Sequence, residues 1–232
     1  WKDKKIDVVV ECTGVFTKRE GAMKHINAGA KKVLISAPAK DHDVTILYGV
    51  NNQVLNKNHL IISAASCTTN CLAPMAKILN DNFKIKNSQY ITAHAYTSTQ
   101  HLNDGDDKKD MRRGRAAALN IVPTSSGAET ATVEAIPELK GKITGYALRV
   151  PVIDGSITNL YAEVDKKTSV EEINAVFKKA AQGKFKSILE YNSAPIVSTD
   201  IIHNPASCIF DANLTKVNDD FVGIAGWYDN EW

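Results

Sequence analysis

The segment Ala65–Cys71, with the sequence ASCTTNC, holds the residues best suited to covalent chemistry. Cys67 stands where a strand-like run ends and a helical pattern begins. A thiol at a helix start lies near the positive end of the helix macrodipole and near unpaired N–H groups, which favour the thiolate. We therefore expect Cys67 to be a nucleophile that is ionised at neutral pH. A buried cysteine inside a Ser/Thr helix cap is the open alternative, and we expect Cys71, one turn further on, to lie in the core.

A second chemical group, His94, ends the strand-like run 89–93. Sites in open α/β sheets form where strands end, so an imidazole there can reach a nucleophile at the end of another strand and act as its base. A single histidine is more often a surface or core residue, and we give that interpretation to the remaining ones: His25, His42, His59, His101 and His203.

Several residues could bind an anion. Arg149 ends a strand-like run and Arg113 lies in a long polar segment, and either guanidinium could bind a phosphate in bidentate fashion. Ser126 and Gly127 precede the helical run 128–136, where backbone N–H groups could bind an anion or where the serine could be an ordinary N-cap. These residues indicate a thiol enzyme that acts on a small phosphorylated carbonyl compound. No Gly-x-Gly-x-x-Gly follows a strand, so motifs alone do not predict a nicotinamide cofactor.

The elements that must position these groups change in character near Cys67. Before it, strand-like runs alternate with a helical pattern, which predicts βαβ units and a doubly wound parallel sheet. The expected elements there are strands at 6–10, 32–36 and 60–63 and a helix through 22–28.

After Cys67, longer alternating strands with few crossovers predict an α+β domain with a mixed, largely antiparallel sheet. Pro74 is expected in the first turn of a helix over 72–83, where proline is tolerated. The polar segment 97–120 is long enough to be a functional loop or an interface. The other expected elements are strands at 89–93, 143–150, 157–164, 207–210 and 221–227 and helices at 128–136 and 170–181.

Composition places the chain among soluble globular proteins, since 44% of its 232 residues are apolar and 23% are charged. The balance of 28 basic against 26 acidic residues gives no case for a nucleic-acid or membrane partner, although a local anion site is compatible with it. The four cysteines lack zinc-ligand spacing, so we expect no metal and reduced thiols in a cytoplasmic protein. No apolar run reaches the ~20 residues that span a bilayer, and no signal peptide is recognisable.

The segments taken together resemble the phosphorylating glyceraldehyde-3-phosphate dehydrogenases of the bacterial type, and the resemblance covers the whole chain. It implies a fragment that lacks both termini: the opening segment with the dinucleotide fingerprint and the closing helix. Residues 1–66 would be the C-terminal part of a Rossmann-like dinucleotide-binding domain, and residues 67–232 the catalytic domain. The segments that carry the resemblance are ASCTTNC, DVVVECTGVF at 7–16, ISAP at 35–38, HAYT at 94–97, RVP at 149–151 and WYDNE at 227–231.

The resemblance implies a glycolytic oxidoreductase that uses NAD to convert D-glyceraldehyde 3-phosphate and inorganic phosphate into 1,3-bisphosphoglycerate. Cys67 would form a thiohemiacetal and then a thioester, with His94 as base. The family assembles as a homotetramer through its sheet faces and the long loop. Substrate and inorganic phosphate would contact Ser66, Thr68, Thr97, Arg113, Ser126, Gly127 and Arg149, while the cofactor would contact Thr13, Gly14, Phe16, Ser36 and Asn230.

The sequence departs from the family pattern at three places. Ser126 replaces a usual Thr, Glu129-Thr130 replaces a more usual Ala-Lys beside the anion loop, and Asp106 stands where many NAD-dependent members have Pro. The main selector between NAD and NADP belongs to the opening segment, so NAD is a family expectation. Two alternatives stay open: an erythrose-4-phosphate dehydrogenase with the same thiol chemistry, and a non-catalytic scaffold or binding protein built on the fold.

Overall fold

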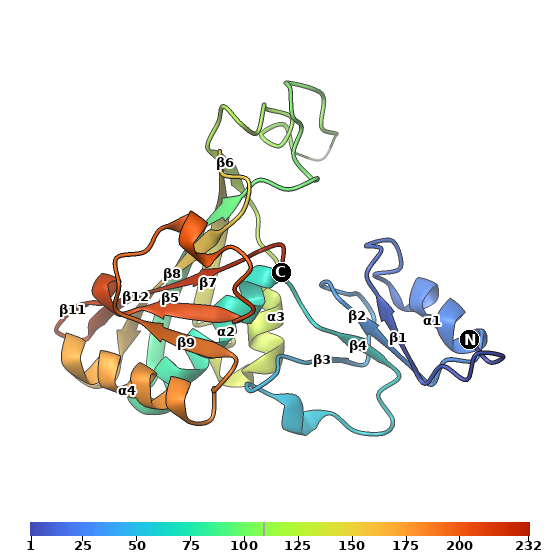
Figure 1. Ribbon diagram of the computed structural model, residues 1–232. Coiled ribbons are helices and arrows are strands. Elements are labelled where there is room, and N and C mark those ends of the chain that lie inside the picture. Colours follow the sequence, from blue (N-terminus) through green and yellow to red (C-terminus); the bar gives the residue numbers. More distant parts are fainter. Residues whose placement is uncertain (109) are drawn as a thin grey trace.

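The computed structural model describes residues 1–108 and 110–232, which form two lobes joined between β4 and α2 (Figure 1). The N-terminal lobe is a parallel sheet of four strands in the order β1-β2-β4-β3, as the alternating pattern predicts. Helix α1 packs against β2 and β4. The elements are β1 Val8–Glu11, α1 Arg19–Asn27, β2 Lys32–Ile35, β3 Val44–Thr45 and β4 Ile61–Ser63.

The C-terminal lobe is built on a sheet of eight strands, with the order β6-β7-β5-β8-β12-β10-β9 and β11 paired to β12. Pairs β5–β7 and β9–β10 are parallel, and the other pairs are antiparallel, so the predicted mixed, largely antiparallel sheet is confirmed. Its strands are β5 Ile85–Ala95, β6 Val122–Thr124, β7 Ile143–Val150, β8 Ser156–Val164, β9 Leu189–Asn192, β10 Cys208–Asp211, β11 Lys216–Asn218 and β12 Phe221–Tyr228.

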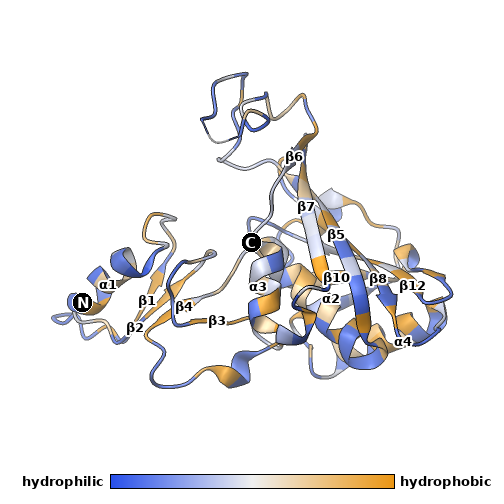
Figure 2. Cartoon of the chain, turned by 180° about the vertical axis from the view of Figure 1, so that it is seen from behind, coloured by the Kyte–Doolittle hydropathy of each residue, from blue (hydrophilic) through white to orange (hydrophobic). Residues whose placement is uncertain are grey.

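Helices α2 Cys67–Phe83, α3 Ala128–Ala135 and α4 Val170–Gln182 belong to this second lobe. Helix α2 contacts β8, β10, β12 and both other helices, so it is buried along most of its length. Helix α4 is amphipathic, capped by Ser169, and buries Phe177 on Phe210 with ring centroids 4.1 Å apart. In Figure 2, orange apolar segments recur on α2 and on the strands, between white and blue ones. Short 3₁₀ helices lie at Asn52–Val54, Pro137–Leu139, Ser198–Ile201 and Ala212–Leu214.

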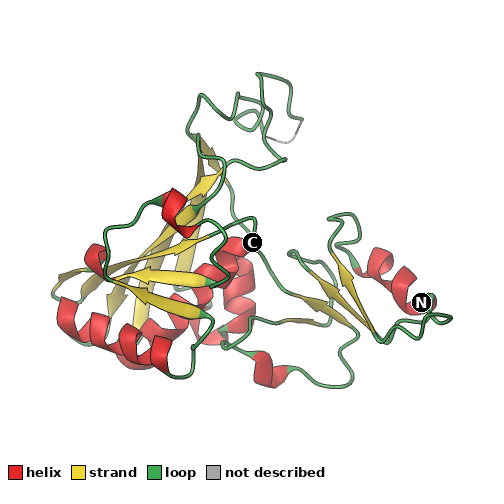
Figure 3. Cartoon of the chain, in the orientation of Figure 1, coloured by secondary structure: helices red, strands yellow, loops and turns green. Residues whose placement is uncertain are grey.

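The segment between β5 and β6 forms only turns and bends in its described residues, and it extends away from the body of the lobe (Figure 3). The predicted loop over 97–120 is thus confirmed. Gly114 is required inside it, since a Cβ at this position would lie 2.1 Å from the carbonyl oxygen of Gly105.

The expected start of the helix over 72–83 is wrong. Helix α2 begins at Cys67, five residues before the expected start, because Ser66 caps it. Pro74 therefore lies inside the helix and not in its first turn. Proline has no N–H to donate to the carbonyl four residues earlier. That residue is Asn70, whose side chain is engaged in the turn that precedes the helix.

Candidate active site

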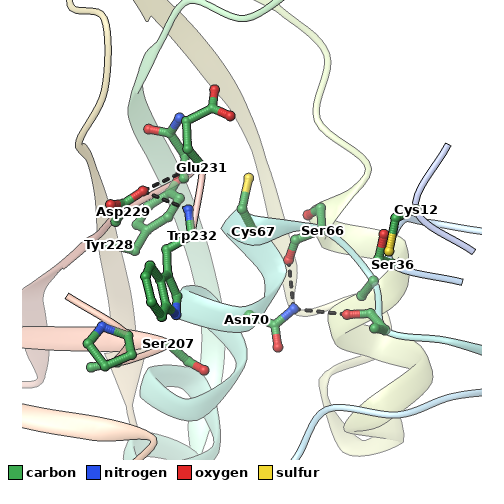
Figure 4. Close-up of a pocket in the computed structure, with 15 residues that line it drawn as sticks. Cys12, Ser36, Ser66, Cys67, Asn70, Ser207, Tyr228, Asp229, Glu231 and Trp232 are labelled. Atoms are coloured by element: carbon green, nitrogen blue, oxygen red, sulfur yellow. Dashed lines mark hydrogen bonds between the residues drawn. The ribbon is translucent and has the colours of Figure 1, made fainter. Parts of the chain in front are cut away.

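The turn before α2 fixes the position of Cys67. Ala65 adopts a left-handed conformation, with φ of 60°, which turns the chain sharply out of β4. The Ser66 hydroxyl then accepts a hydrogen bond of 3.1 Å from the backbone N–H of Thr69. The Asn70 side-chain amide donates to the carbonyl oxygens of Ala64 and Ser66, both at 2.9 Å. Cys67 is thereby the first residue of the helix, and its side chain projects into a cavity (Figure 4).

Cys67 and His94 form a pair, as expected from their placement at a helix start and a strand end. The Cys67 Sγ lies 3.3 Å from the His94 Nε2. His94 is buried on β5, and its Nδ1 lies 2.7 Å from the Ala95 carbonyl oxygen and 2.7 Å from the Arg149 Nη1. The Arg149 guanidinium can only donate a hydrogen bond, and the Ala95 carbonyl can only accept one. The neutral His94 ring can therefore carry its proton on Nε2 and accept from Arg149, or carry it on Nδ1 and donate to Ala95. When Nδ1–H donates to Ala95, Nε2 is the acceptor that can take a proton from the thiol.

The expectation that Cys67 is ionised at neutral pH is wrong for this resting site. Burial raises the pKa of the Cys67 thiol, although hydrogen bonds from Thr68 and the charge of Arg149 act in the opposite direction. Burial, followed by the charge of Arg149, lowers the pKa of His94 to about 4. Desolvation thus outweighs the helix end, and both partners are neutral at pH 7. The site therefore holds a thiol next to an unprotonated imidazole that is ready to accept its proton.

A buried layer of hydroxyl groups lies beneath Cys67. The Tyr228 hydroxyl lies 2.9 Å from the Thr68 Oγ1 and 2.8 Å from the Thr92 Oγ1. The Tyr228 ring also meets the His94 ring edge-on, at 5.9 Å between centroids. Thr68, expected as a substrate contact, directs its hydroxyl inward to this layer and to the Cys67 sulfur. The Thr68 backbone N–H also donates a hydrogen bond to the Cys67 sulfur.

Two arginines lie on the far side of the imidazole. Arg149 is paired with His94 in the β5–β7 register, and its Nε is buried with no partner among the described residues. The Arg113 Nε donates to the Thr124 Oγ1 at 2.9 Å. Burial lowers the pKa of Arg149, and the positive charge of Arg113 adds to this lowering, so the two guanidinium groups are close enough to interact. Two neighbouring guanidinium groups, one of which has a buried N–H donor without a partner among the described residues, are suited to bind an anion.

The other expected anion contacts lie in the turn after β5 and in the turn before α3. Thr97 follows β5, and the Gln100 side-chain oxygen accepts from its backbone N–H at 2.8 Å, which fixes the turn. Ser126 and Gly127 directly precede α3, and the Ser126 Oγ accepts from the Ala128 N–H at 3.3 Å. The Ser126 hydroxyl is also close enough to Tyr90 to lower that phenol's pKa, although burial raises it overall.

The cavity in front of Cys67 has a volume of about 540 Å³ and is lined by both lobes. Ser36 and Cys12 line it on one side and Glu231 and Trp232 on the other, as Figure 4 shows. Asn230 also lines this cavity, and its Oδ1 accepts from the Ser156 Oγ at 2.5 Å. This bond orients the amide so that its Nδ2, buried and without a partner among the described residues, remains as a donor.

The remaining expected cofactor contacts do not line this cavity. Thr13, Gly14 and Phe16 lie in the loop after β1, where the Thr13 backbone N–H donates to the Glu11 carboxylate at 2.8 Å. Phe16 packs edge-on against His25, with ring centroids 5.7 Å apart. These three residues therefore belong to the N-terminal lobe alone in this structure.

Sequence reasoning missed the residues that hold the site residues in place. Asn70 secures the turn, Ser156 orients Asn230, and Tyr228 supports both Thr68 and the His94 ring. Asp229 secures the last segment, since its carboxylate accepts from the backbone N–H groups of Glu231 and Trp232 at 2.9 and 2.7 Å. The run Trp227–Glu231 was visible only as a resemblance, because contacts between distant segments leave no local pattern.

Within residues 1–108 and 110–232, no group of three or more His, Cys, Asp or Glu side chains could hold a metal ion. Among the same residues, no helix is both long and apolar enough to cross a membrane.

Comparisons with known proteins agree with this architecture. A model of the family described as "Glyceraldehyde 3-phosphate dehydrogenase, C-terminal domain" matches residues 66–230. The whole chain is 57% identical to a glyceraldehyde-3-phosphate dehydrogenase of Mycobacterium bovis and covers 68% of that protein. It is 56% identical to that of Mycobacterium leprae, again over 68% of the relative. It is 52% identical to glyceraldehyde-3-phosphate dehydrogenase 1 of Streptomyces avermitilis, over 70% of that relative.

These matches place the chain among the dehydrogenases, a class of oxidoreductases. Within that class it belongs to the glyceraldehyde-3-phosphate dehydrogenase family. A dinucleotide cofactor is what that family implies.

Proposed function

We propose that this protein catalyses the NAD-dependent oxidative phosphorylation of D-glyceraldehyde 3-phosphate to 1,3-bisphosphoglycerate, a reaction of glycolysis. One observation carries the proposal: the Cys67 Sγ lies 3.3 Å from the His94 Nε2, directly beside Arg149 with its vacant buried donor. A nucleophile, its base and an anion-binding group are together what an aldehyde carrying a phosphate requires.

The covalent steps take place on Cys67. The thiol gives its proton to the His94 Nε2 as the sulfur attacks the aldehyde carbon, and that proton then passes to the new alkoxide, which gives a thiohemiacetal. The Cys67 backbone N–H and the imidazole stabilise the developing oxyanion. His94 next accepts the hydroxyl proton while a hydride leaves the same carbon, and the product is a thioester. When bound, NAD accepts that hydride.

Inorganic phosphate then attacks the thioester carbon and displaces the sulfur. The acyl phosphate retains free energy that hydrolysis would release, so water must be kept from the thioester. The thiolate recovers its proton through His94. We assign inorganic phosphate to Ser66, Thr68, Ser126 and Gly127, and the substrate's own phosphate to Thr97, Arg113 and Arg149.

The cofactor would lie between the lobes. The cavity that joins Ser36 to Cys67 and Asn230 supports this placement, since it brings an amide donor close to the thiol. Residues 1–66 would act as the C-terminal part of the dinucleotide-binding domain and residues 67–232 as the catalytic domain. Thr13, Gly14 and Phe16 would contact the cofactor from the loop after β1.

A homotetramer in the cytoplasm completes the proposal. Exposed apolar side chains support an interface through the sheet face and the long loop. On the sheet, Tyr161 and Phe221 stack with centroids 6.4 Å apart and remain 40% and 51% exposed. On the loop, Met111 and Leu119 are more than four-fifths exposed, at 87% and 83%. Such patches are typical of surfaces that a partner covers.

The test is an assay of reduced cofactor formation with glyceraldehyde 3-phosphate, phosphate and NAD. Cys67→Ser should reduce turnover to background, while Cys208→Ser, a matched change at a buried cysteine on β10, should leave it unchanged. Erythrose 4-phosphate and NADP serve as competing substrates. Equal turnover of erythrose 4-phosphate, or full activity in Cys67→Ser, would refute the proposal.

A further inference from the structure

Three sulfur atoms converge on one glycine in the core of the C-terminal lobe. A Cβ placed on Gly226 of β12 would lie 2.6 Å from the Cys208 Sγ, 3.0 Å from the Cys71 Sγ and 2.9 Å from the Met75 Sδ. All three side chains are fully buried. Only glycine fits beside them, because the sulfurs occupy the space of a side chain.

Cys71 and Cys208 are neighbouring thiols and not a disulfide. Both are unpaired in this structure, and the Cys71 thiol donates to the Gly226 carbonyl oxygen at 3.4 Å. Burial raises the pKa of Cys71 well above its usual value, and contact with Cys208 raises it further. The Cys71 and Cys208 sulfurs are neighbours because both lie within 3.0 Å of the same point beside Gly226, although one comes from α2 and the other from β10.

Cys71 is also close to the nucleophile on α2. It follows Cys67 by four residues on α2, so the two side chains are neighbours on the helix. The charge of Cys67 contributes to the raised pKa of Cys71, which agrees with this proximity. Of the thiols of Cys67, Cys71 and Cys208, that of Cys67 alone is partly exposed. The thiols therefore lie in sequence from the cavity to the core.

We propose that Cys208 is a resolving thiol, so that oxidation of Cys67 by a hydroperoxide passes through Cys71 and ends as a buried Cys71–Cys208 disulfide. The site is separate from the dehydrogenase reaction, and only the entry of the oxidant at Cys67 rests on the proposed function. Its effect is to return Cys67 to the thiol state and to protect it from further oxidation.

Each step balances. The Cys67 sulfur attacks the hydroperoxide and becomes a sulfenic acid, while the oxidant leaves as an alcohol or as water. The Cys71 sulfur displaces water from the sulfenic acid and forms a Cys67–Cys71 disulfide. The Cys208 sulfur then attacks the Cys71 sulfur, and Cys67 departs as a thiolate that takes up a proton. Two thiols are oxidised and one hydroperoxide is reduced.

Burial controls the rate of these exchanges. Each thiol exchange requires a thiolate. Cys71 and Cys208 are fully buried, whereas Cys67 is partly exposed. The internal dithiol should therefore not react with the oxidant directly. Formation of the final disulfide should depend on Cys67 and should accelerate as the pH rises.

Trypsin places Cys208 on a different peptide from Cys67 and Cys71. Cleavage after lysine gives one peptide, 58–77, that holds Cys67 and Cys71, and another, 187–216, that holds Cys208. After brief treatment of the protein with hydrogen peroxide and alkylation, the proposal predicts a cross-linked pair of these peptides. Fragmentation should place the bond at Cys71 and the alkyl group at Cys67.

Three variants test the order of events. Cys67→Ser should abolish the cross-linked pair. Cys208→Ser should keep full basal turnover but, after peroxide, should accumulate the internal Cys67–Cys71 disulfide and several-fold more Cys67 sulfinic acid. Cys71→Ala should also lack the cross-link. It is a second variant without one member of the disulfide, for use if circular dichroism shows that Cys208→Ser folds poorly.

Two outcomes would overturn the inference: no 58–77 to 187–216 cross-link in the wild-type protein, or an undiminished cross-link in Cys67→Ser. The two proposals can fail separately. A protein with dehydrogenase activity and no cross-link would refute the resolving role alone. A Cys67-dependent cross-link in a protein without dehydrogenase activity would refute the proposed function alone.

Discussion

The two lobes differ in how well each can hold a chemical group still. The N-terminal sheet has a core of four buried residues, Ala22, Val33, Ile35 and Ile61, and leaves Val8 and Val10 of β1 about half exposed. The C-terminal lobe has a far larger core, which also takes in Leu47 and Val50 from the connection before β4. Cys67, His94 and Arg149 all belong to the larger lobe, so the reacting groups rest on the more rigid frame.

The same contrast explains where the N-terminal lobe contributes. It supplies Ser36 and Cys12 to the cavity, and therefore affects what binds more than what reacts. Polar contacts hold it to the larger lobe: Thr45 donates to Glu134 of α3, and the His42 Nε2 lies 3.7 Å from a carboxylate oxygen of the same Glu134. Four experiments would break or sharpen this division.

The largest effect is expected from His94→Asn. Loss of the base should lower kcat by about 10²–10⁴-fold while the KM for NAD changes little, because the imidazole belongs only to the catalytic lobe. Steady-state kinetics with varied NAD give both values. His59→Asn, a change at a partly buried histidine of the other lobe, is the control. A large rise in the KM for NAD with unchanged kcat in His94→Asn would contradict the division.

Core truncation should separate the lobes by stability. Phe177→Ala removes the ring stacked on Phe210 and should cost about 3–5 kcal/mol of unfolding free energy, with loss of activity at moderate temperature. Ile61→Ala, in the small core, should mainly increase hydrogen exchange in β1, β2 and β4. Urea titration and hydrogen-exchange mass spectrometry measure these effects. If Ile61→Ala exposed α2 and β5 as much as β2, the lobes would unfold as one unit.

The contact between the lobes should show a smaller coupling. Glu134→Gln weakens the acceptor for the Thr45 hydroxyl, and Thr45→Val removes the donor, each at a cost of about 1–2 kcal/mol. The double variant should cost about 1 kcal/mol less than the sum, as expected for residues in contact. Denaturant unfolding of the four proteins closes the cycle. Additive costs would show that the two side chains do not interact in solution.

The smallest effect is an acid sensitivity confined to the N-terminal lobe. Burial alone would raise the pKa of Asp43, but hydrogen bonds from Ile61, Arg19 and Leu60 outweigh it and lower the pKa to about 2. A lowered folded-state pKa means that the stabilisation is present above the usual aspartate pKa and is lost as the pH falls toward 2. We expect about 1 kcal/mol after screening.

Asp43→Asn should remove this pH dependence of the urea midpoint. The Arg19 Nη1 contact at 2.6 Å and the backbone contacts at 2.7 and 2.9 Å all lie within the same lobe. The loss should therefore appear in the exchange of β2 and β4 and leave β5 and β8 unchanged. An identical acid response in the wild type and in Asp43→Asn would show that other carboxylates dominate.

Local patterns were sufficient for most of the elements but not for the contacts between them. The alternation of apolar residues located β7 and α4 to within a residue, because each has one buried face. Strand β6 was missed because Pro123 argues against a strand. It is tolerated there because β6 is the edge strand of its sheet. Strand β3, with two residues, is too short to show a period.

The candidate site divides in the same way. Cys67 and His94 could be selected from their positions at element ends, and the structure brings them to 3.3 Å. The protonation state of the Cys67 thiol could not be predicted in this way. Its burial, over the Tyr228 hydroxyl layer and beside Arg149, is a tertiary property that outweighs the local helix end. The oriented amide of Asn230 also depends on Ser156, which lies on a different strand.

The two hydrogen bonds from the Asn70 side chain affect how the Cys67 side chain is oriented in a partly folded protein. One side chain ties the residue before the turn and the residue after it to the first coil of α2, so the bend and the helix form or melt together. The thiol is then held in its working direction by its own neighbours in the chain, before any ligand arrives. Removal of the Asn70 side chain would therefore disorder the orientation of the Cys67 thiol, although no reacting atom would change.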